Sequence, residues 1–459
     1  MCDQRRKNRD GVGLCCAAFL AVIIVFSPRA VAAADLLDVY HLAQANDPQI
    51  RAAEAAYRAA LEKRPQSRAQ LLPSISVSAD VSRERQDITN STGFYTDNTY
   101  YSTTKGYLLS LNQPLFHNDY WVQLRQSDAV VAQAEAQYKA AQQDLIARAV
   151  IRYFAVLEAQ DNLRFATAEK EANERQLEQT RQRFDVGLIA ITDVHDAQAA
   201  YDLSAAQEID AQNQLTSALE AMNELIGVQK ESFAPLAEKT PLVAPDPADI
   251  DQWSETAMQR NFQLLASELQ LKIATDEVDL RSSGHFPTLD LNARYGNSDY
   301  SGGSFGGRDV EDAVVGVELV IPIYQGGGVS ASVREAAELR EQAREQLEQQ
   351  RRATLRQARD AYLTVISTIK RVTALQQAVI SAQSALEANE AGLEVGTRTS
   401  VDVLLVRSRK FGADRDHAKA RYDYILNSLR LKLAAGILAE DDLEKVNAWF
   451  VHPAAASKP

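Results

Sequence analysis

The chain carries the sequence VGLIAITDV at residues 186–194 and, 209 positions later, the sequence VGTRTSVDV at residues 395–403. Both stretches begin with Val-Gly and end with Asp-Val, which indicates that one is a copy of the other. Glycine readily adopts the left-handed backbone geometry that a tight reversal between two helices needs. We therefore expect each stretch to be the turn of a helical hairpin.

Long segments without proline surround both turns. No proline occurs between Pro114 and Pro235 or between Pro322 and Pro453, and both segments are rich in Ala, Gln, Glu, Arg and Leu. These residues favour helices, and apolar positions recur at helical spacing. At 1.5 Å per residue each incoming helix would be about 100 Å long, which is typical of an extended coiled coil. The predicted helices are 118–184 and 193–226 in the first hairpin, and 328–395 and 399–436 in the second.

The segments before the two long helices change to strand periodicity. Ile75 and Val77 alternate with serines, and Leu289 and Leu291 alternate with Asp and Asn. Alternation of this kind predicts strands, and we expect β-hairpins over about 72–114 and about 286–322. Both hairpins are rich in aromatic residues, which form girdles around transmembrane β-barrels. We favour membrane strands over the alternative of two soluble hairpins with a packed aromatic face.

The two halves of the chain repeat each other. Ala43 and Pro73 recur as Ala257 and Pro287, each 214 residues later. We expect a first repeat over 35–228 and a second over 252–440, joined by a proline-rich linker or equatorial segment at 229–251 and followed by a tail at 441–459. Each repeat would open with a leading helix, over 35–66 and 252–283. The leading and returning helices together match the length of the long helix, so we expect them to stack end to end beside it.

The N-terminus has the pattern of a secretory signal peptide over 1–34. Four basic residues within 5–9 precede an apolar stretch over 12–26, and three alanines follow at 32–34. The apolar stretch is shorter than the roughly 20 residues of a spanning helix, so we favour a cleaved signal over a membrane anchor. All three cysteines lie before residue 17. The exported part therefore has no thiol for a disulfide, a metal or a nucleophile.

Four strands cannot close a barrel, and open strand edges cannot lie in lipid. Copies of the chain must therefore associate if the strands enter a membrane. Two chains would supply eight strands and three would supply twelve, and both even numbers are allowed. The strand count does not choose between them.

The two turn stretches, together with IPIYQGG at 321–327, make the chain similar to the TolC-type outer membrane factor (outer membrane efflux protein) family. The resemblance covers essentially the whole mature chain. It implies a mainly α fold with β: an internally duplicated α-helical coiled-coil barrel plus four transmembrane strands per chain. It also implies a homotrimer with a 12-stranded outer-membrane barrel that continues into a periplasmic tunnel. The implied partners are outer-membrane lipid, a periplasmic adaptor (membrane fusion) protein and an inner-membrane transporter, for efflux or type I secretion.

The resemblance also assigns roles to residues at the two turns. The turns of this family meet the adaptor, and the exposed apolar residues beside the glycines favour such a contact over a purely structural turn. In related channels the aspartate and arginine just past the turns hold the periplasmic mouth closed. The implied docking residues are Val186, Gly187, Leu188, Val395, Gly396 and Thr397, and the implied gate residues are Asp193, Arg398 and Asp402.

Two gate positions depart from the family pattern. Leu393 replaces a tyrosine beside the latch, and Leu405 replaces a second aspartate of the aperture. Because one acidic ring remains, at Asp402, we expect weaker block by divalent cations than in a relative with two rings.

The remaining composition excludes several classes of function. The formal charge of −13 argues against a nucleic-acid partner, since phosphate binding needs a basic surface. The six histidines have no metal-ligand spacing, and no P-loop, GxSxG or HExxH motif occurs. We therefore expect no enzyme activity, no cofactor and no metal. Alternatives to a passive duct are an envelope structural or adhesive coiled-coil protein without a pore, or a secreted hydrolase. The exported substrate and the class of transporter are left open.

Overall fold

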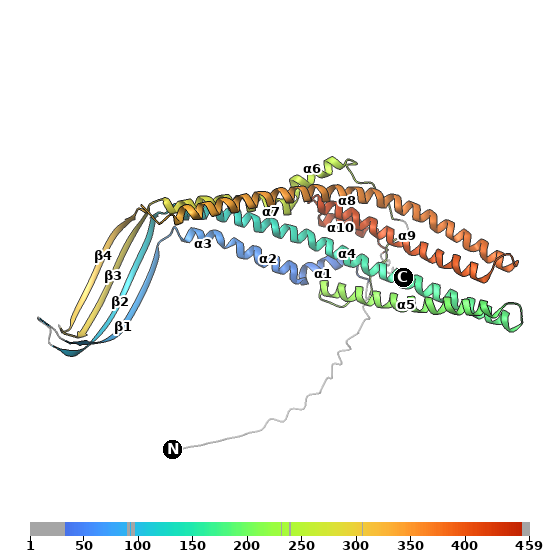
Figure 1. Ribbon diagram of the computed structural model, residues 1–459, viewed down its shortest axis with the longest axis horizontal. Helices are drawn as coiled ribbons and strands as arrows, with labels where there is room; N and C mark the ends of the chain where they lie inside the picture. The colour runs from blue at the N-terminus through green and yellow to red at the C-terminus, as the bar shows by residue number, and fades with distance from the viewer. Residues whose placement is uncertain are drawn as a thin grey trace, which may run out of the picture.

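The computed structural model describes residues 33–451, apart from 90, 91, 93–96, 231, 238, 239 and 305. The molecule is a long rod with a β-sheet at one end and two helical turns at the other (Figure 1). The signal peptide predicted over 1–34 lies outside the described residues, except for Ala33 and Ala34.

The four strands form one antiparallel sheet in the order β1-β2-β3-β4. The two expected hairpins are therefore joined, because β2 pairs with β3. Register places Ile75, Leu111, Ala293 and Val315 in one row across the sheet, so one face is apolar in the half nearest the helices. The neighbouring row, Ser76–Ser110–Arg294–Val314, is more polar and lies on the other face. The strands are β1 (Ser74–Ile88), β2 (Asn98–Phe116), β3 (Thr288–Gly302) and β4 (Arg308–Val320).

Two helical hairpins build most of the rod. In each, a helix of 68 or 67 residues leads to the turn and a helix about half as long returns. Within the described ranges, no helix combines the length and the apolar character needed to cross a membrane. The first hairpin consists of α4 (Asn118–Asp185) and α5 (Ile191–Ile226), and the second of α8 (Gly328–Glu394) and α9 (Ser400–Ala434).

The leading segments are broken helices, whereas the sequence predicted one continuous helix in each repeat. Asp47 interrupts the first, since its carboxylate accepts hydrogen bonds from the backbone N–H groups of Gln49 and Ile50. Asn261, its equivalent 214 residues later, caps the second break in the same way. A side chain that caps a new helix stabilises a break in the old one. The pieces are α1 (Leu36–Asn46), α2 (Pro48–Leu61) and α3 (Lys63–Ala69), then α6 (Ile250–Arg260), α7 (Phe262–Ser282) and the 3-10 turn η1 (Ser283–His285).

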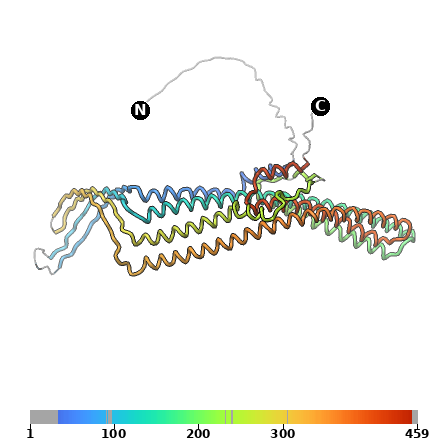
Figure 2. The backbone as a smooth tube through the Cα atoms, turned by 90° about the horizontal axis from the view of Figure 1, so that it is seen from above, coloured from blue at the N-terminus to red at the C-terminus, as the bar shows by residue number. Residues whose placement is uncertain are grey.

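Near the sheet, four helices lie side by side in one curved layer, in the order α3, α4, α7 and α8 (Figure 2). This is the order of the strands to which they connect. Along α4, the leading helices occupy the half near the sheet and α5 occupies the half near its turn (Figure 1). The expected end-to-end stacking thus describes the first repeat.

The main core lies at the middle of the rod, in a cluster that we call the equatorial core. Tyr153 of α4 is fully buried there, and its hydroxyl donates hydrogen bonds to the backbone oxygens of Ala34 and Ala234. Burial raises the pKa of Tyr153 far above its usual range. The rings of Phe233 and Phe450 pack on it edge-on, with centroids 5.7 Å and 5.1 Å away.

This core includes parts of two segments that the sequence predicted to be a linker or equatorial segment and a tail. Within 229–251, Phe233 pairs with Ala34 and Leu236 pairs with Phe450 as short β-bridges. The tail predicted over 441–459 contains most of helix α10 (Glu440–Asn447), whose Leu443 is buried in the core. Both segments close the middle of the rod because their apolar residues are buried there.

Candidate functional site

The first tip, formed by Val186, Gly187 and Leu188, ends the α4–α5 hairpin. Gly187 has a φ of 77°, and a Cβ added to it would meet nothing within 4 Å. Conformation alone therefore selects glycine. The Gly187 N–H donates to the Phe184 oxygen at 2.8 Å and the Leu188 N–H to the Arg183 oxygen at 2.9 Å. These bonds satisfy the last carbonyls of α4.

The second tip, formed by Val395, Gly396 and Thr397, has the same construction. Gly396 has a φ of 79°. The backbone N–H of Thr397 donates to the Gly392 oxygen at 2.8 Å, and its hydroxyl donates to the same oxygen at 3.1 Å. The two tips are therefore equivalent turns, as the sequence repeat predicted.

Both tips expose apolar side chains. Val186 is 70% exposed, Leu188 73% and Val395 75%, although each is joined to a well-formed helix end. Large apolar groups at this exposure gain nothing from the fold of one chain. Their position at the far end of the rod makes them available to another protein.

Asp402 caps the helix that follows the second tip. Its carboxylate accepts hydrogen bonds from the Thr399 N–H at 3.0 Å and the Thr399 hydroxyl at 2.8 Å, and the Thr399 hydroxyl accepts from the Asp402 N–H. The hydrogen bonds from Thr399, assisted by the charge of Arg398, lower the pKa of Asp402. Asp402 is therefore a partly exposed, ionised carboxylate fixed at the first turn of α9.

Asp193 and Arg398 do not pair within the chain: among the described residues, no ion pair or hydrogen bond joins their side chains. Asp193 lies in the first turn of α5, and Arg398 lies over Gly392, where an added Cβ would come within 2.7 Å of the arginine Cγ. Of the two substituted positions that the family resemblance assigns to a gate, Leu405 is 52% exposed on α9 and Leu393 is half-buried on α8.

Contacts between α4 and α9 were missed by the sequence reasoning. Arg415 binds the buried carboxylate of Glu169 at 3.2 Å, and Lys419 binds Glu158 at 2.6 Å. Nearby, the Tyr422 hydroxyl donates to the Asp161 carboxylate at 2.6 Å. The partners are 246 to 261 residues apart, so no local sequence pattern marks them. These α4–α9 links join the two helical hairpins of the chain.

The site offers no evident metal centre: across the described residues, His, Cys, Asp and Glu side chains form no group of three or more that would hold a metal ion.

Comparison with known proteins identifies the chain's relatives. A family model for outer membrane efflux proteins matches residues 39–228 and 253–437. The outer membrane protein TolC of Vibrio cholerae serotype O1 is 40% identical over 437 residues, which cover 94% of this chain and 97% of that protein. The alkaline protease secretion protein AprF of Pseudomonas aeruginosa is 32% identical, covering 91% and 87% respectively. The crystal structure of the Campylobacter jejuni CmeC outer membrane channel has the same fold, with a TM-score of 0.76, 18% identity and 97% of both chains covered.

An apolar-faced sheet continuing into long helical hairpins defines a TolC-type channel subunit. The chain belongs to the outer membrane efflux protein family. It is an exit duct of the outer membrane that extends into the periplasm, and it serves together with pump or secretion components. The family resemblance, fold class and location predicted from the sequence are confirmed, and the alternative of an envelope protein without a pore has no support.

Proposed function

We propose that three copies form a passive channel-tunnel, which a periplasmic adaptor and an inner-membrane transporter open from the tips. One observation carries this proposal: the sheet has an apolar face and unpaired edges at β1 and β4, which lipid does not tolerate. Pairing β4 of one copy with β1 of the next removes every edge. Three copies give twelve strands, enough to enclose a lumen, whereas eight strands are filled by their own side chains.

The gate consists of Asp193, Arg398 and Asp402. Asp193 and Arg398 have no ion-pair partner among the described residues of their own chain. Asp193 of one copy can therefore pair with Arg398 of a neighbouring copy. A shielded pair of this kind is worth about 1.5–3 kcal/mol, and an exposed one less, which is a bond that a partner protein can break. Three Asp402 carboxylates around the axis would repel one another and attract cations.

Docking uses the two tips. The adaptor covers the exposed apolar side chains of Val186, Leu188 and Val395, while Gly187, Gly396 and Thr397 keep the turns narrow. Burial of these side chains against the adaptor would favour association by roughly 25 cal/mol for each Å² of apolar surface. The transporter supplies the energy, because the duct has no nucleotide-binding motif.

The cargo includes exported proteins as well as small molecules. Relatives support both: AprF of P. aeruginosa is an alkaline protease secretion protein and PrtF of Dickeya chrysanthemi a proteases secretion protein, while BepC of Brucella suis is an outer membrane efflux protein. We propose that this chain acts in type I secretion and in efflux, according to the transporter that engages it.

Cysteine cross-linking tests the assembly and the gate together. The mature chain has no cysteine, so Asp193→Cys combined with Arg398→Cys gives a clean pair of thiols. Oxidation should yield covalent trimers and lower the single-channel conductance in planar bilayers, and reduction should restore it. A matched pair, Arg175→Cys with Arg398→Cys, should not cross-link. Cross-links confined to single chains would contradict the gate, and a monomer without conductance would contradict the duct itself.

A further inference from the structure

A groove lies between α3 and α4, next to the sheet. It has a volume of about 790 Å³ and combines two arginines with apolar side chains. Leu72 and Trp121 give it an exposed apolar wall, at 50% and 57% exposure. Arg64 and Arg68 lie on its α3 side.

The groove is at the level where the membrane meets the periplasm. Leu72 precedes β1 by two residues, and Trp121 follows the end of β2 by five. Since the strands cross the membrane and the helices extend into the periplasm, this level is the headgroup region of the inner leaflet. Tryptophan is enriched at such interfaces because its ring is apolar and its N–H is polar.

The charge of the groove is only partly neutralised. Arg64 binds Asp128 at 3.0 Å, yet its side chain is 67% exposed. Arg68 is exposed, and among the described residues its guanidinium has no ion-pair or hydrogen-bond partner. At least one guanidinium is therefore available to an anion.

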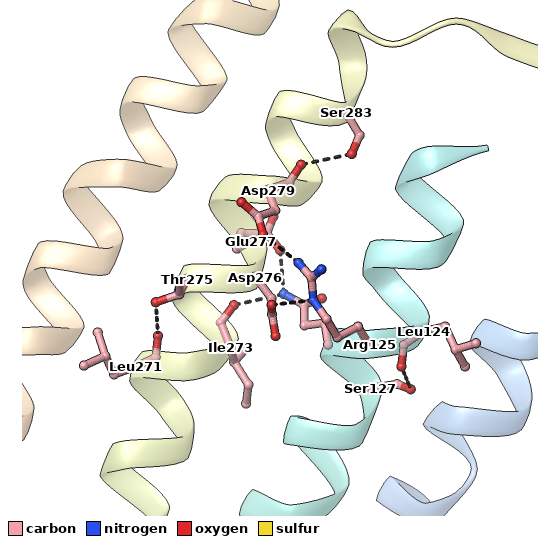
Figure 3. Close-up of polar contacts among 11 residues, drawn as sticks. Leu124, Arg125, Ser127, Leu271, Ile273, Thr275, Asp276, Glu277, Asp279 and Ser283 are labelled. Atoms are coloured by element: carbon pink, nitrogen blue, oxygen red, sulfur yellow. Dashed lines mark hydrogen bonds and ion pairs between the residues drawn. The ribbon is translucent and has the colours of Figure 1, made fainter. Parts of the chain in front are cut away.

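The second repeat provides an internal comparison. At the equivalent positions, 214 residues later, Arg64 and Arg68 are replaced by Val278 and Ser282. There the nearby cation, Arg125 of α4, is bound by Asp276 at 2.9 Å and by Asp279 at 2.6 Å (Figure 3). These contacts raise the pKa of Arg125. Carboxylates of the second repeat thus neutralise Arg125, whereas Arg68 of the first repeat has no such partner among the described residues.

We propose that the groove binds the headgroup of an anionic phospholipid from the inner leaflet of the outer membrane. The guanidinium groups of Arg64 and Arg68 match phosphate oxygens, which arginine binds in a bidentate manner. Trp121 lies at the level of the glycerol backbone, and Leu72 contacts the first part of an acyl chain. One lipid per chain would fix the height of the barrel in the membrane at the start of the tunnel.

Native mass spectrometry of the full mature chain in mild detergent tests this site. Phosphatidylglycerol and phosphatidylcholine with identical acyl chains are added in equal amounts, and the bound lipids are counted. Phosphatidylglycerol should be preferred by about fivefold for each arginine engaged. Arg64→Gln combined with Arg68→Gln should abolish the preference, and Arg68→Gln alone should reduce it. The matched control is Arg175→Gln, an equally exposed arginine near the first tip.

Asp128→Asn separates lipid binding from a structural role. This change releases Arg64 from its carboxylate partner, so it should strengthen the preference for phosphatidylglycerol about fivefold. A groove that served only the fold would show no gain.

Three results would overturn the proposal. Equal retention of the two lipids would show that the groove does not select an anionic headgroup. Full competition by soluble glycerol phosphate would show that it binds any small anion rather than a lipid. Loss of the oligomer in the double variant would instead show that the groove is an interface between copies. Conductance in bilayers, measured on the same variants, should persist. Failure of the lipid-site proposal is therefore distinguishable from failure of the proposed duct.

Discussion

Individual residues at the tips have two kinds of role: some fix the backbone of the turn, and others present an exposed side chain. Gly187 and Gly396 are required by backbone conformation, while Val186, Leu188 and Val395 are apolar groups that one chain leaves uncovered. Asp402 has both kinds of role, because its side chain caps α9 and also presents an ionised carboxylate at the start of that helix. A substitution there changes the local fold as well as the charge of the proposed aperture, whereas Leu405 can be changed without touching a cap.

Leu405→Asp should strengthen block of the channel by divalent cations. Leu405 lies one turn beyond Asp402 and is half exposed, so an aspartate there adds a second acidic ring at little cost in folding. Conductance titrated with a divalent cation should show block at a concentration at least several times lower than in the unmodified channel. Leu405→Asn controls for polarity alone, and an identical titration for the Asp and Asn variants would contradict a ring at this level.

Asp47 supports a prediction about pH. Burial alone raises the pKa of its carboxyl, but the ion pair with Arg148 at 2.7 Å and the helix-capping hydrogen bonds outweigh burial and lower it. The stabilisation is complete above the unfolded-state pKa, near 4, and is lost as the pH falls through the lower folded-state pKa. Asp47→Asn keeps a cap, as Asn261 does, but loses the ion pair.

We expect Asp47→Asn to lower the free energy of unfolding by about 1.5–3 kcal/mol at pH 7. The difference from the unmodified protein should shrink below about pH 4. Urea unfolding followed by circular dichroism at pH 7 and at pH 3 measures this difference. A deficit of the same size at pH 7 and at pH 3 would rule out the ionised carboxylate as its source.

The helices and strands could be predicted from the spacing of proline and glycine, because the backbone conformations of these two residues interrupt regular elements. Both long helices end within one residue of the predicted limits. The breaks at Asp47 and Asn261 were not predicted, since a capping side chain competes with the helix only locally. Helix α10 was missed because its burial depends on the equatorial core. At the site, the tip turns were predictable from Val-Gly, whereas the α4–α9 links depend on distant pairing.

Those links support a prediction about opening. Glu169→Gln should raise the conductance of the resting channel, because it removes the charge that binds Arg415 and so loosens α9 from α4. Glu171→Gln on the same helix is the control, since Glu171 is 59% exposed and pairs with Arg175 of its own helix. Planar-bilayer recordings compare the two. Equal conductance would mean that the hairpins are held together elsewhere.

At the scale of the whole molecule, the two faces of the sheet decide insertion. Val315 shares its row with Ala293 and Leu111 on the apolar face, whereas Val314 is beside Arg294 on the other face. A lysine in contact with lipid costs about 2–4 kcal/mol at the centre of the bilayer, but a lysine facing water in a lumen costs little.

Val315→Lys should therefore lower the yield of assembled protein in the outer membrane, while Val314→Lys should be tolerated. Three copies multiply the cost, so the contrast should be at least tenfold in trimer recovered from outer-membrane fractions. Equal yields for the two variants would show that the apolar face is covered by protein rather than by lipid.

The bridges that Ala34 makes with Phe233, and Phe450 with Leu236, bring the two ends of the described part of the chain against its own midpoint. The path of the polypeptide is thus almost a closed loop, whose two ends and midpoint meet at the middle of the rod around Tyr153. A short peptide joining residue 451 to residue 34 would complete that loop, and new ends could then be opened at a tip. Such a circular permutant would carry a label to the proposed docking end of the duct while leaving the equatorial core and the barrel strands uncut.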